Sequence, residues 1–167
     1  MRIFGITGWK NSGKTTLMER LVAELCHRGY SISTIKHAHH NVDVDQPGKD
    51  SYRHRAAGAH EVILASKNRF ALMHELRGAD EPQLKDLLAH LAPVDLVLIE
   101  GYKREPHPKI ETALRPGKRP LLAQGDGFIC AVAAGYETPE LPVPVLDIND
   151  ISTIADFIVG QTGMQRR

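Results

Sequence analysis

The feature that most constrains this chain is a glycine-rich loop near its N-terminus, Gly8-Trp9-Lys10-Asn11-Ser12-Gly13-Lys14-Thr15, which matches the pattern G-x-x-x-x-G-K-S/T. The glycines let successive backbone N–H groups point at phosphate oxygens, the lysine brings a charge to the terminal phosphates, and the threonine hydroxyl is a ligand for Mg²⁺. A helix that follows the loop adds the positive end of its dipole. We therefore expect phosphate contacts from Gly8, Asn11, Ser12, Gly13, Lys14, Thr15 and Thr16.

The residues on either side of this loop have the pattern that the motif requires. Residues 2–7 are a short, mostly apolar run typical of a buried strand. After the loop, apolar residues recur at helical spacing, and Gly29 is placed to end that helix: Leu17, Met18, Leu21, Val22 and Leu25. Strand, loop and helix in this order distinguish a nucleotide-binding loop from a plain glycine-rich turn.

The rest of the chain alternates between strand-like and helix-like segments, which is typical of an α/β protein with a mainly parallel sheet flanked by helices. We expect a single P-loop NTPase-like domain over residues 1–167. Residues 61–66 and 69–74 predict a hairpin. Four prolines surround residues 109–114, so we expect an excursion over 104–120 that contains an edge strand.

The apolar strand over residues 94–100 carries an acid at each end. In an open parallel sheet, ligands bind outside the carboxyl ends of the strands. Asp95 is therefore expected to be remote from the phosphates, and Glu100 is expected beside them, where it would hold Mg²⁺ together with Thr15. A strand-end carboxylate with no ligand is the plainer alternative. Gly101 would let the backbone pass close to a phosphate.

The polar loop after the second strand is the next dense group of functional side chains. Asp43 and Asp45 are candidates for sensing the terminal phosphate and its metal ion. Three histidines at 37, 39 and 40 form an alternative, a transition-metal site, although no cysteine ligand accompanies them. These residue patterns leave ATP and GTP nearly even as the predicted nucleotide, because the N-K-x-D motif that guanine-selective P-loop proteins often carry is not present.

The composition excludes several classes of protein. With 21 basic and 20 acidic residues, the chain has no large field of one sign, so we expect no nucleic-acid partner. No apolar stretch approaches the length of a membrane span, and no signal segment is evident, so we expect no membrane partner. Cys26 and Cys130 form no C-x-x-C pair, and we interpret them as reduced packing residues of a cytoplasmic protein.

Several further blocks, in order and at matching spacing, make the chain resemble a known family. It is similar to the MobB family, the adaptor proteins of molybdopterin-guanine dinucleotide biosynthesis. The H-x-H-H and D-x-P-G-K-D-S blocks are much more particular to that family than the phosphate loop is. The blocks that carry the resemblance are residues 8–16, 35–40, 43–51, 57–59, 98–103 and 146–150.

The resemblance implies properties that the residue spacing does not show. Proteins of this family bind GTP with Mg²⁺, have at most weak GTPase activity and form homodimers. They assist a guanylyltransferase of the MobA type that joins GMP to molybdopterin, so that enzyme and the pterin itself are the implied partners. The implied nucleotide residues are Gly13, Lys14, Thr15 and Thr16, with Mg²⁺ near Thr15 and Glu100. Trp9 stands where related dimeric proteins carry a signature lysine, and Lys10 is displaced by one.

Two other classes of function are compatible with the same loop. A small-molecule kinase would need an arginine-rich lid, for which Arg53, Arg55 and Arg69 are the candidates. A metallochaperone GTPase would use His37, His39 and His40 to carry its metal.

Overall fold

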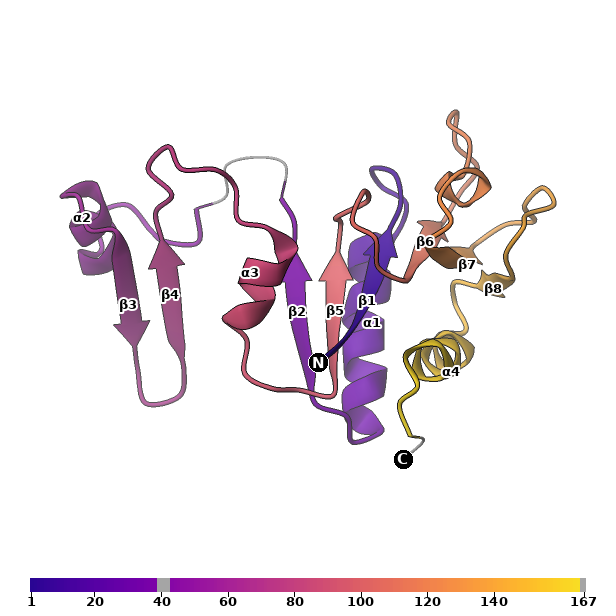
Figure 1. Cartoon of the computed structure of the whole chain (residues 1–167), viewed down its shortest axis with the longest axis horizontal. Coiled ribbons are helices and arrows are strands. Elements are labelled where there is room, and N and C mark those ends of the chain that lie inside the picture. The colour runs from indigo at the N-terminus through magenta and orange to yellow at the C-terminus, as the bar shows by residue number, and fades with distance from the viewer. Residues whose placement is uncertain (39–42, 166–167) are drawn as a thin grey trace. The chain divides into compact units, whose positions relative to one another are not determined.

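The computed structural model describes residues 1–38 and 43–165 and divides the chain into two compact units (Figure 1). The first unit comprises Met1–His37 and Leu91–Arg167, and the second comprises Ala38–His90. The first unit carries the phosphate loop and the large sheet, and the second carries a hairpin and two short helices. A single domain over residues 1–167 stays a prediction.

The first unit is built on a six-stranded sheet in the order β2-β5-β1-β6-β7-β8, in which every pair of neighbouring strands runs parallel. The predicted P-loop NTPase-like α/β fold is thereby confirmed. Because the strands are parallel, their carboxyl ends meet at one edge of the sheet, which is where the phosphate loop leaves β1. The strands are β1 (Arg2–Thr7), β2 (Ile32–Lys36), β5 (Leu96–Glu100), β6 (Lys109–Ala113), β7 (Ile129–Ala134) and β8 (Val145–Asp147).

Helices α1 (Lys14–His27) and α4 (Ile151–Thr162) cover one face of this sheet and form the main core with it. Side chains alternate between the faces of a strand, and β7 divides accordingly: Ala131 and Ala133 belong to the main core. Val132 and Ala134 belong to a smaller core beside the 3₁₀ helix η1 (Leu122–Gln124). Each fully buried leucine or isoleucine contributes about 1.5–3 kcal/mol through burial.

The predicted edge strand is wrong, because β6 lies in the middle of the sheet between β1 and β7. All five of its residues are buried. The four prolines mislead because Pro106 and Pro108 precede the strand while Pro116 and Pro120 follow it, so no ladder N–H is lost inside residues 109–113.

The second unit contains α2 (Asp50–Ala56), β3 (Glu61–Ala65), β4 (Phe70–His74) and α3 (Leu84–Ala89). Strands β3 and β4 pair antiparallel in a two-stranded sheet, which confirms the predicted hairpin. Its apolar side chains are unusually open to solvent: Ile63 is 65% exposed and Phe70 is 74% exposed. A two-stranded hairpin is marginally stable by itself, so this exposure marks a surface that favours further packing.

Two smaller expectations are settled by burial and helix length. Cys26 is exposed, so its interpretation as a packing residue is wrong: it lies on the outer side of α1, while Leu21 and Leu25 turn toward the core. Cys130 is partly buried beside the main core. In the part of the chain that the structure describes, no helix has the length and apolar character that a membrane span requires.

Candidate functional site

The loop between β1 and α1 has a backbone that only particular residues can adopt. Gly8 has φ of 143°, and a Cβ atom there would lie 2.5 Å from the Ser12 hydroxyl oxygen and 2.7 Å from the Thr112 carbonyl oxygen. Gly13 has φ of 97° at the start of α1. Asn11 has φ of 61°, a left-handed conformation that asparagine tolerates better than most residues. The loop therefore needs glycine at both glycine positions of the motif, Gly8 and Gly13.

A contact from β6 holds this loop in place, and it was not predicted from the sequence. The hydroxyls of Ser12 and Thr112 lie 2.7 Å apart, and the Thr112 hydroxyl also donates to the Thr7 carbonyl at 3.1 Å. The backbone N–H of Leu114 donates to the Ser12 carbonyl at 3.1 Å. Because the order of strands is a long-range property, nothing in the loop's own residues indicates that β6 is its neighbour.

The side chain of Lys14 curls back over the loop. Its ammonium donates to the carbonyls of Gly8 at 3.2 Å and Trp9 at 2.7 Å. Burial lowers the pKa of Lys14, and the nearby charges of Lys103 and Lys36 lower it further while Glu100 opposes them. A pocket of about 300 Å³ adjoins the ammonium. Its lining contains six of the seven predicted phosphate contacts, without Gly8, and adds the residue that follows β6: Asn11, Ser12, Gly13, Lys14, Thr15, Thr16 and Leu114.

Thr15 and Glu100, the predicted metal-binding pair, come together at the carboxyl ends of the central strands. The Thr15 hydroxyl donates to Glu100 Oε1 at 3.1 Å, and the Lys36 ammonium lies 3.6 Å from the same oxygen. Glu100 is buried, with 8% of its surface exposed. A hydroxyl and a carboxylate are the hard oxygen donors that Mg²⁺ prefers, so this pair fits the ion. Asp95 lies at the other end of β5, where it accepts from the backbone N–H and the hydroxyl of Ser31, and the predicted role of Glu100 as a metal ligand stays a prediction.

Gly101 lets the chain after β5 pack closely against His37, which follows β2. It has φ of 99°, and a Cβ there would lie 3.0 Å from the Cβ of His37. The imidazole of His37 stacks on the ring of Tyr102 with centroids 4.5 Å apart. These contacts join the exits of β2 and β5. The predicted approach of the Gly101 backbone to a phosphate stays a prediction.

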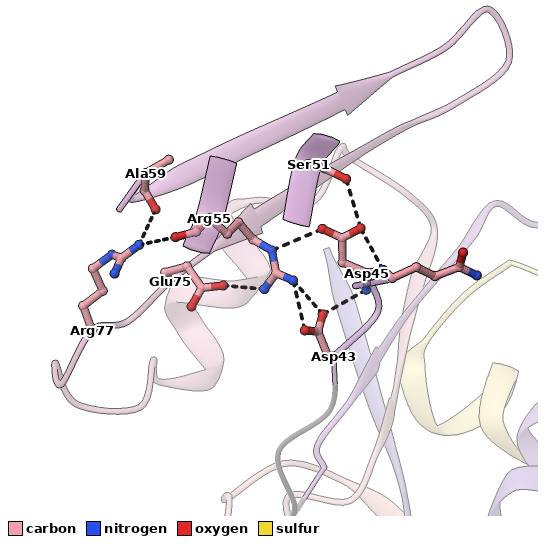
Figure 2. Close-up of polar contacts among 8 residues, drawn as sticks. Asp43, Asp45, Ser51, Arg55, Ala59, Glu75 and Arg77 are labelled. Carbon is pink, nitrogen blue, oxygen red and sulfur yellow. Dashed lines mark hydrogen bonds and ion pairs between the residues drawn. The ribbon is translucent and has the colours of Figure 1, made fainter. Parts of the chain in front are cut away.

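Asp43 and Asp45 belong to the second unit, where both are engaged by one arginine (Figure 2). The guanidinium of Arg55 lies 2.9 Å from Asp43 and 3.3 Å from Asp45, and it also reaches Glu75 at 2.6 Å. These partners, Glu75 foremost, raise the pKa of Arg55, while bonds from the Asp45 N–H and Arg55 lower the pKa of Asp43. Their predicted role as sensors of the terminal phosphate stays a prediction.

The two other functions were predicted from arginine and histidine side chains. Arg55, a candidate lid residue of a kinase, is held by carboxylates of its own unit. His39 and His40 lie outside the described residues. Within residues 1–38 and 43–165, no group of three or more histidine, cysteine, aspartate or glutamate side chains is arranged to hold a metal ion.

A buried polar cluster on the sheet face opposite α1 was also not predicted from the sequence. It consists of Thr7 and residues at alternate positions before and within β6, His107, Lys109 and Glu111. Burial lowers the pKa of His107 to about 4 and raises that of Glu111. Lys109 is capped by the carbonyls of Lys103 and Glu105, and Glu111 accepts from the Ala123 N–H. The alternation of Lys109, Ile110 and Glu111 was the available signal, but it equally fits a strand with one face in water.

A parallel α/β sheet with a glycine-rich loop, a helix-start lysine and a Thr–Glu pair defines the class of P-loop NTPase-like proteins. Comparison with known proteins gives the family. The family model for MobB, described as molybdopterin guanine dinucleotide synthesis protein B, matches residues 3–135. The chain belongs to the MobB family.

Curated relatives and solved structures agree with this membership. The chain is 46% identical over 159 residues to the molybdopterin-guanine dinucleotide biosynthesis adapter protein of Haemophilus influenzae, covering 93% of this chain and 86% of the relative. It is 42% identical over 161 residues to that of Escherichia coli, covering 94% and 91%. The crystal structure of a MobB homolog from Bacillus stearothermophilus superposes with a TM-score of 0.74 at 28% identity, covering 99% and 100%. The chain is thereby an adapter in molybdopterin-guanine dinucleotide biosynthesis, a role that implies a partner enzyme.

Proposed function

We propose that this adapter binds GTP with Mg²⁺ in the loop between β1 and α1 and presents it to a guanylyltransferase of the MobA type. The observation that carries the proposal is the Thr15–Glu100 pair beside the Lys14 pocket. A carboxylate buried beside the loop would repel an anion that bound there without a metal ion, because like charges at short distance repel each other. A metal ion between that carboxylate and the phosphates would offset the repulsion between the two negative groups, so the carboxylate favours binding of Mg²⁺ together with the nucleotide.

Each group of the loop has a distinct part in this proposal. The backbone N–H groups from Asn11 to Thr16 and the start of α1 bind the phosphates, as a helix N-terminus favours negative charge. Lys14 exchanges its bonds to the loop carbonyls for bonds to phosphate oxygens. Thr15 and Glu100 hold Mg²⁺, which neutralises phosphate charge when bound. These residues position the nucleotide, and at most a weak GTPase activity is expected from them.

The choice of GTP and of the partner enzyme rests on the family. The curated relatives are named as adapter proteins of molybdopterin-guanine dinucleotide biosynthesis, and a guanine dinucleotide has to receive its guanylate from a guanine nucleotide. Molybdopterin is the other component of that product, so we propose it as a ligand of the complex that this adapter forms with the partner enzyme.

We also propose that the chain forms a homodimer through the β3–β4 hairpin. Its exposed apolar side chains, Ile63, Phe70 and Leu72 among them, belong to a two-stranded sheet that would gain stability from further packing. Light scattering should give twice the mass of 18.5 kDa for the wild type. Phe70→Asp should give the monomer, whereas Phe128→Asp, a change at an exposed phenylalanine of the first unit, should leave the mass unchanged. A wild-type monomer at micromolar concentration would refute the dimer.

The nucleotide proposal is tested by calorimetric titration of GTP and of ATP in the presence of Mg²⁺. We expect a preference for GTP of about tenfold or more, equal to about 1.4 kcal/mol. Lys14→Ala should abolish binding, and Lys85→Ala, which changes an exposed lysine on α3, should not. Unchanged GTP affinity in Lys14→Ala would remove the loop from the site. A preference for ATP would favour the kinase class instead.

A further inference from the structure

The phosphate loop contains a tryptophan with two cations over its ring, and the proposed function assigns this tryptophan no role. Trp9 is the second residue of the loop motif and the only tryptophan of the chain. The Lys103 ammonium lies 4.5 Å from the centroid of its ring, and the Arg119 guanidinium lies 4.7 Å from it. The indole N–H donates to the Pro120 carbonyl at 3.0 Å. Cation–π contacts of this kind hold a cation in place without neutralising it.

These cations come from two segments that the fold fixes next to the loop. Lys103 follows Glu100 and Gly101 at the exit of β5, and its carbonyl accepts from the buried ammonium of Lys109 at 3.0 Å. Arg119 lies in the segment that follows β6. The first residue of this segment, Leu114, lines the phosphate pocket. Both segments thus begin at strand ends that already belong to the nucleotide site.

The cations gathered here form no direct ion pairs with acids in the described part of the chain. Among the described residues, no carboxylate lies within ion-pair distance of Lys14, Lys103 or Arg119, whereas Arg28, Arg55 and Lys109 all have such partners. Burial and the neighbouring Arg119 lower the pKa of Lys103, with Glu111 opposing them, and Lys103 in turn lowers that of Lys14. Like charges held together in this way favour an anionic ligand, because the ligand removes their mutual repulsion.

We propose that Lys103 and Arg119, held over the indole of Trp9, form a second phosphate-binding subsite beside the loop of the proposed GTP site. Lys103 acts electrostatically both on Lys14 and on Arg119, so the subsite adjoins the lysine of the proposed GTP site. Its ligand is a phosphate group outside the loop's own backbone cradle. That phosphate is either the terminal phosphate of GTP or one carried by a second ligand. The inference rests on the proposed function, since it takes the loop as the nucleotide site.

The test compares GTP, GDP and inorganic phosphate. Calorimetry gives the affinities, and the emission of Trp9 reports ligands that draw the cations from its ring. In Lys103→Met we expect GTP to bind about tenfold more weakly while GDP is little affected. Lys103→Arg should restore most of the affinity, because arginine also stacks on indole and carries the charge. Lys118→Met is the matched control, because it changes an exposed lysine of the segment that carries Arg119.

Adding inorganic phosphate to the GDP complex distinguishes the terminal phosphate of GTP from a phosphate carried by a second ligand. If GTP and GDP are weakened equally in Lys103→Met but phosphate changes the Trp9 emission only in the wild type, the subsite takes a second ligand. If neither the GTP–GDP difference nor the phosphate response depends on Lys103, the subsite does not exist. Lys14→Ala separates the two proposals: loss of GTP binding there with no effect of Lys103→Met overturns this inference alone.

Discussion

The phosphate loop illustrates how single residues depend on partners far away in the sequence. Its glycines and Lys14 can be recognised from spacing, because backbone conformation and phosphate chemistry demand them locally. The hydroxyl of Thr112 cannot be recognised in this way, although it contacts both Ser12 and the Thr7 carbonyl from inside β6. The part of the site predicted from the sequence is therefore the part that we propose contacts the nucleotide, and the part missed is what holds the loop in position.

Replacing Thr112 should separate the hydroxyl from the shape of the side chain. Thr112→Val keeps the volume but removes both hydrogen bonds, so we expect a loss of about 1–2 kcal/mol in the free energy of unfolding. The freed Ser12 should also weaken GTP binding several-fold. Thr112→Ser retains the hydroxyl and should stay close to the wild type in affinity. Urea unfolding and calorimetry measure the two effects. Equal behaviour of the valine and serine variants would show that the hydroxyl does not support the loop.

His107 should make the folded state sensitive to acid. Its ring nitrogens have no hydrogen-bond partner among the described residues, and burial with the nearby Lys109 lowers its pKa from 6.5 to about 4, against the pull of Asp126. Below about pH 6.5 the unfolded chain takes up a proton that the folded chain refuses, so stability falls as the pH decreases toward 4. At pH 5 this should cost about 2 kcal/mol relative to pH 7.5.

His107→Phe is the variant that checks this effect, because it keeps a ring of similar shape and removes the titration. Urea unfolding at the two pH values should show that the variant loses about 2 kcal/mol less than the wild type on acidification. An identical acid sensitivity in both proteins would assign the effect to other groups, and the low pKa of His107 would then be wrong.

Among the secondary-structure elements, those with strong local signals were predicted well. Strand β1, the loop and α1 follow from an apolar run, a motif and a helical period. Strand β6 was placed at an edge because four prolines surround it in the sequence. Its central place depends on which strands lie beside it and on what covers Lys109 and Glu111. Those contacts are formed by distant parts of the chain, so no local pattern encodes them.

The cap of α4 gives a prediction for this element. The Asp150 carboxylate accepts from the Thr153 N–H at 3.0 Å and from the Thr153 hydroxyl at 2.7 Å. Asp150→Ala removes an acceptor for the unpaired N–H groups of the first turn, so we expect the melting temperature to fall by about 2–4 °C. Asp150→Asn keeps a capping oxygen and should lose much less. Thermal unfolding followed by circular dichroism measures both variants, and a fall of equal size in both would point to lost charge rather than lost capping.

For the whole molecule, the division into two units has a physical basis in separate sets of interactions. The first unit is held by its sheet and its two apolar cores. The second depends heavily on polar contacts: Arg55 joins Asp43 and Asp45 to Glu75, and Arg77 donates to the carbonyls of Arg55 and Ala59 (Figure 2). A unit with few buried apolar side chains should open at lower free energy than one with a large core.

Arg55→Lys tests this independence. Lysine cannot reproduce the fork that serves three carboxylates, so amides of residues 43–77 should exchange hydrogen about tenfold faster or more while those of β1 and β5 keep their protection. Arg53→Lys, at an exposed arginine with one long contact to Asp50, is the control. Uniformly faster exchange would mean that the chain opens as one body. GTP affinity measured on the same variants bears on the nucleotide site: a loss in Arg55→Lys alone would support the predicted roles of Asp43 and Asp45, because their carboxylates depend on Arg55 for their position.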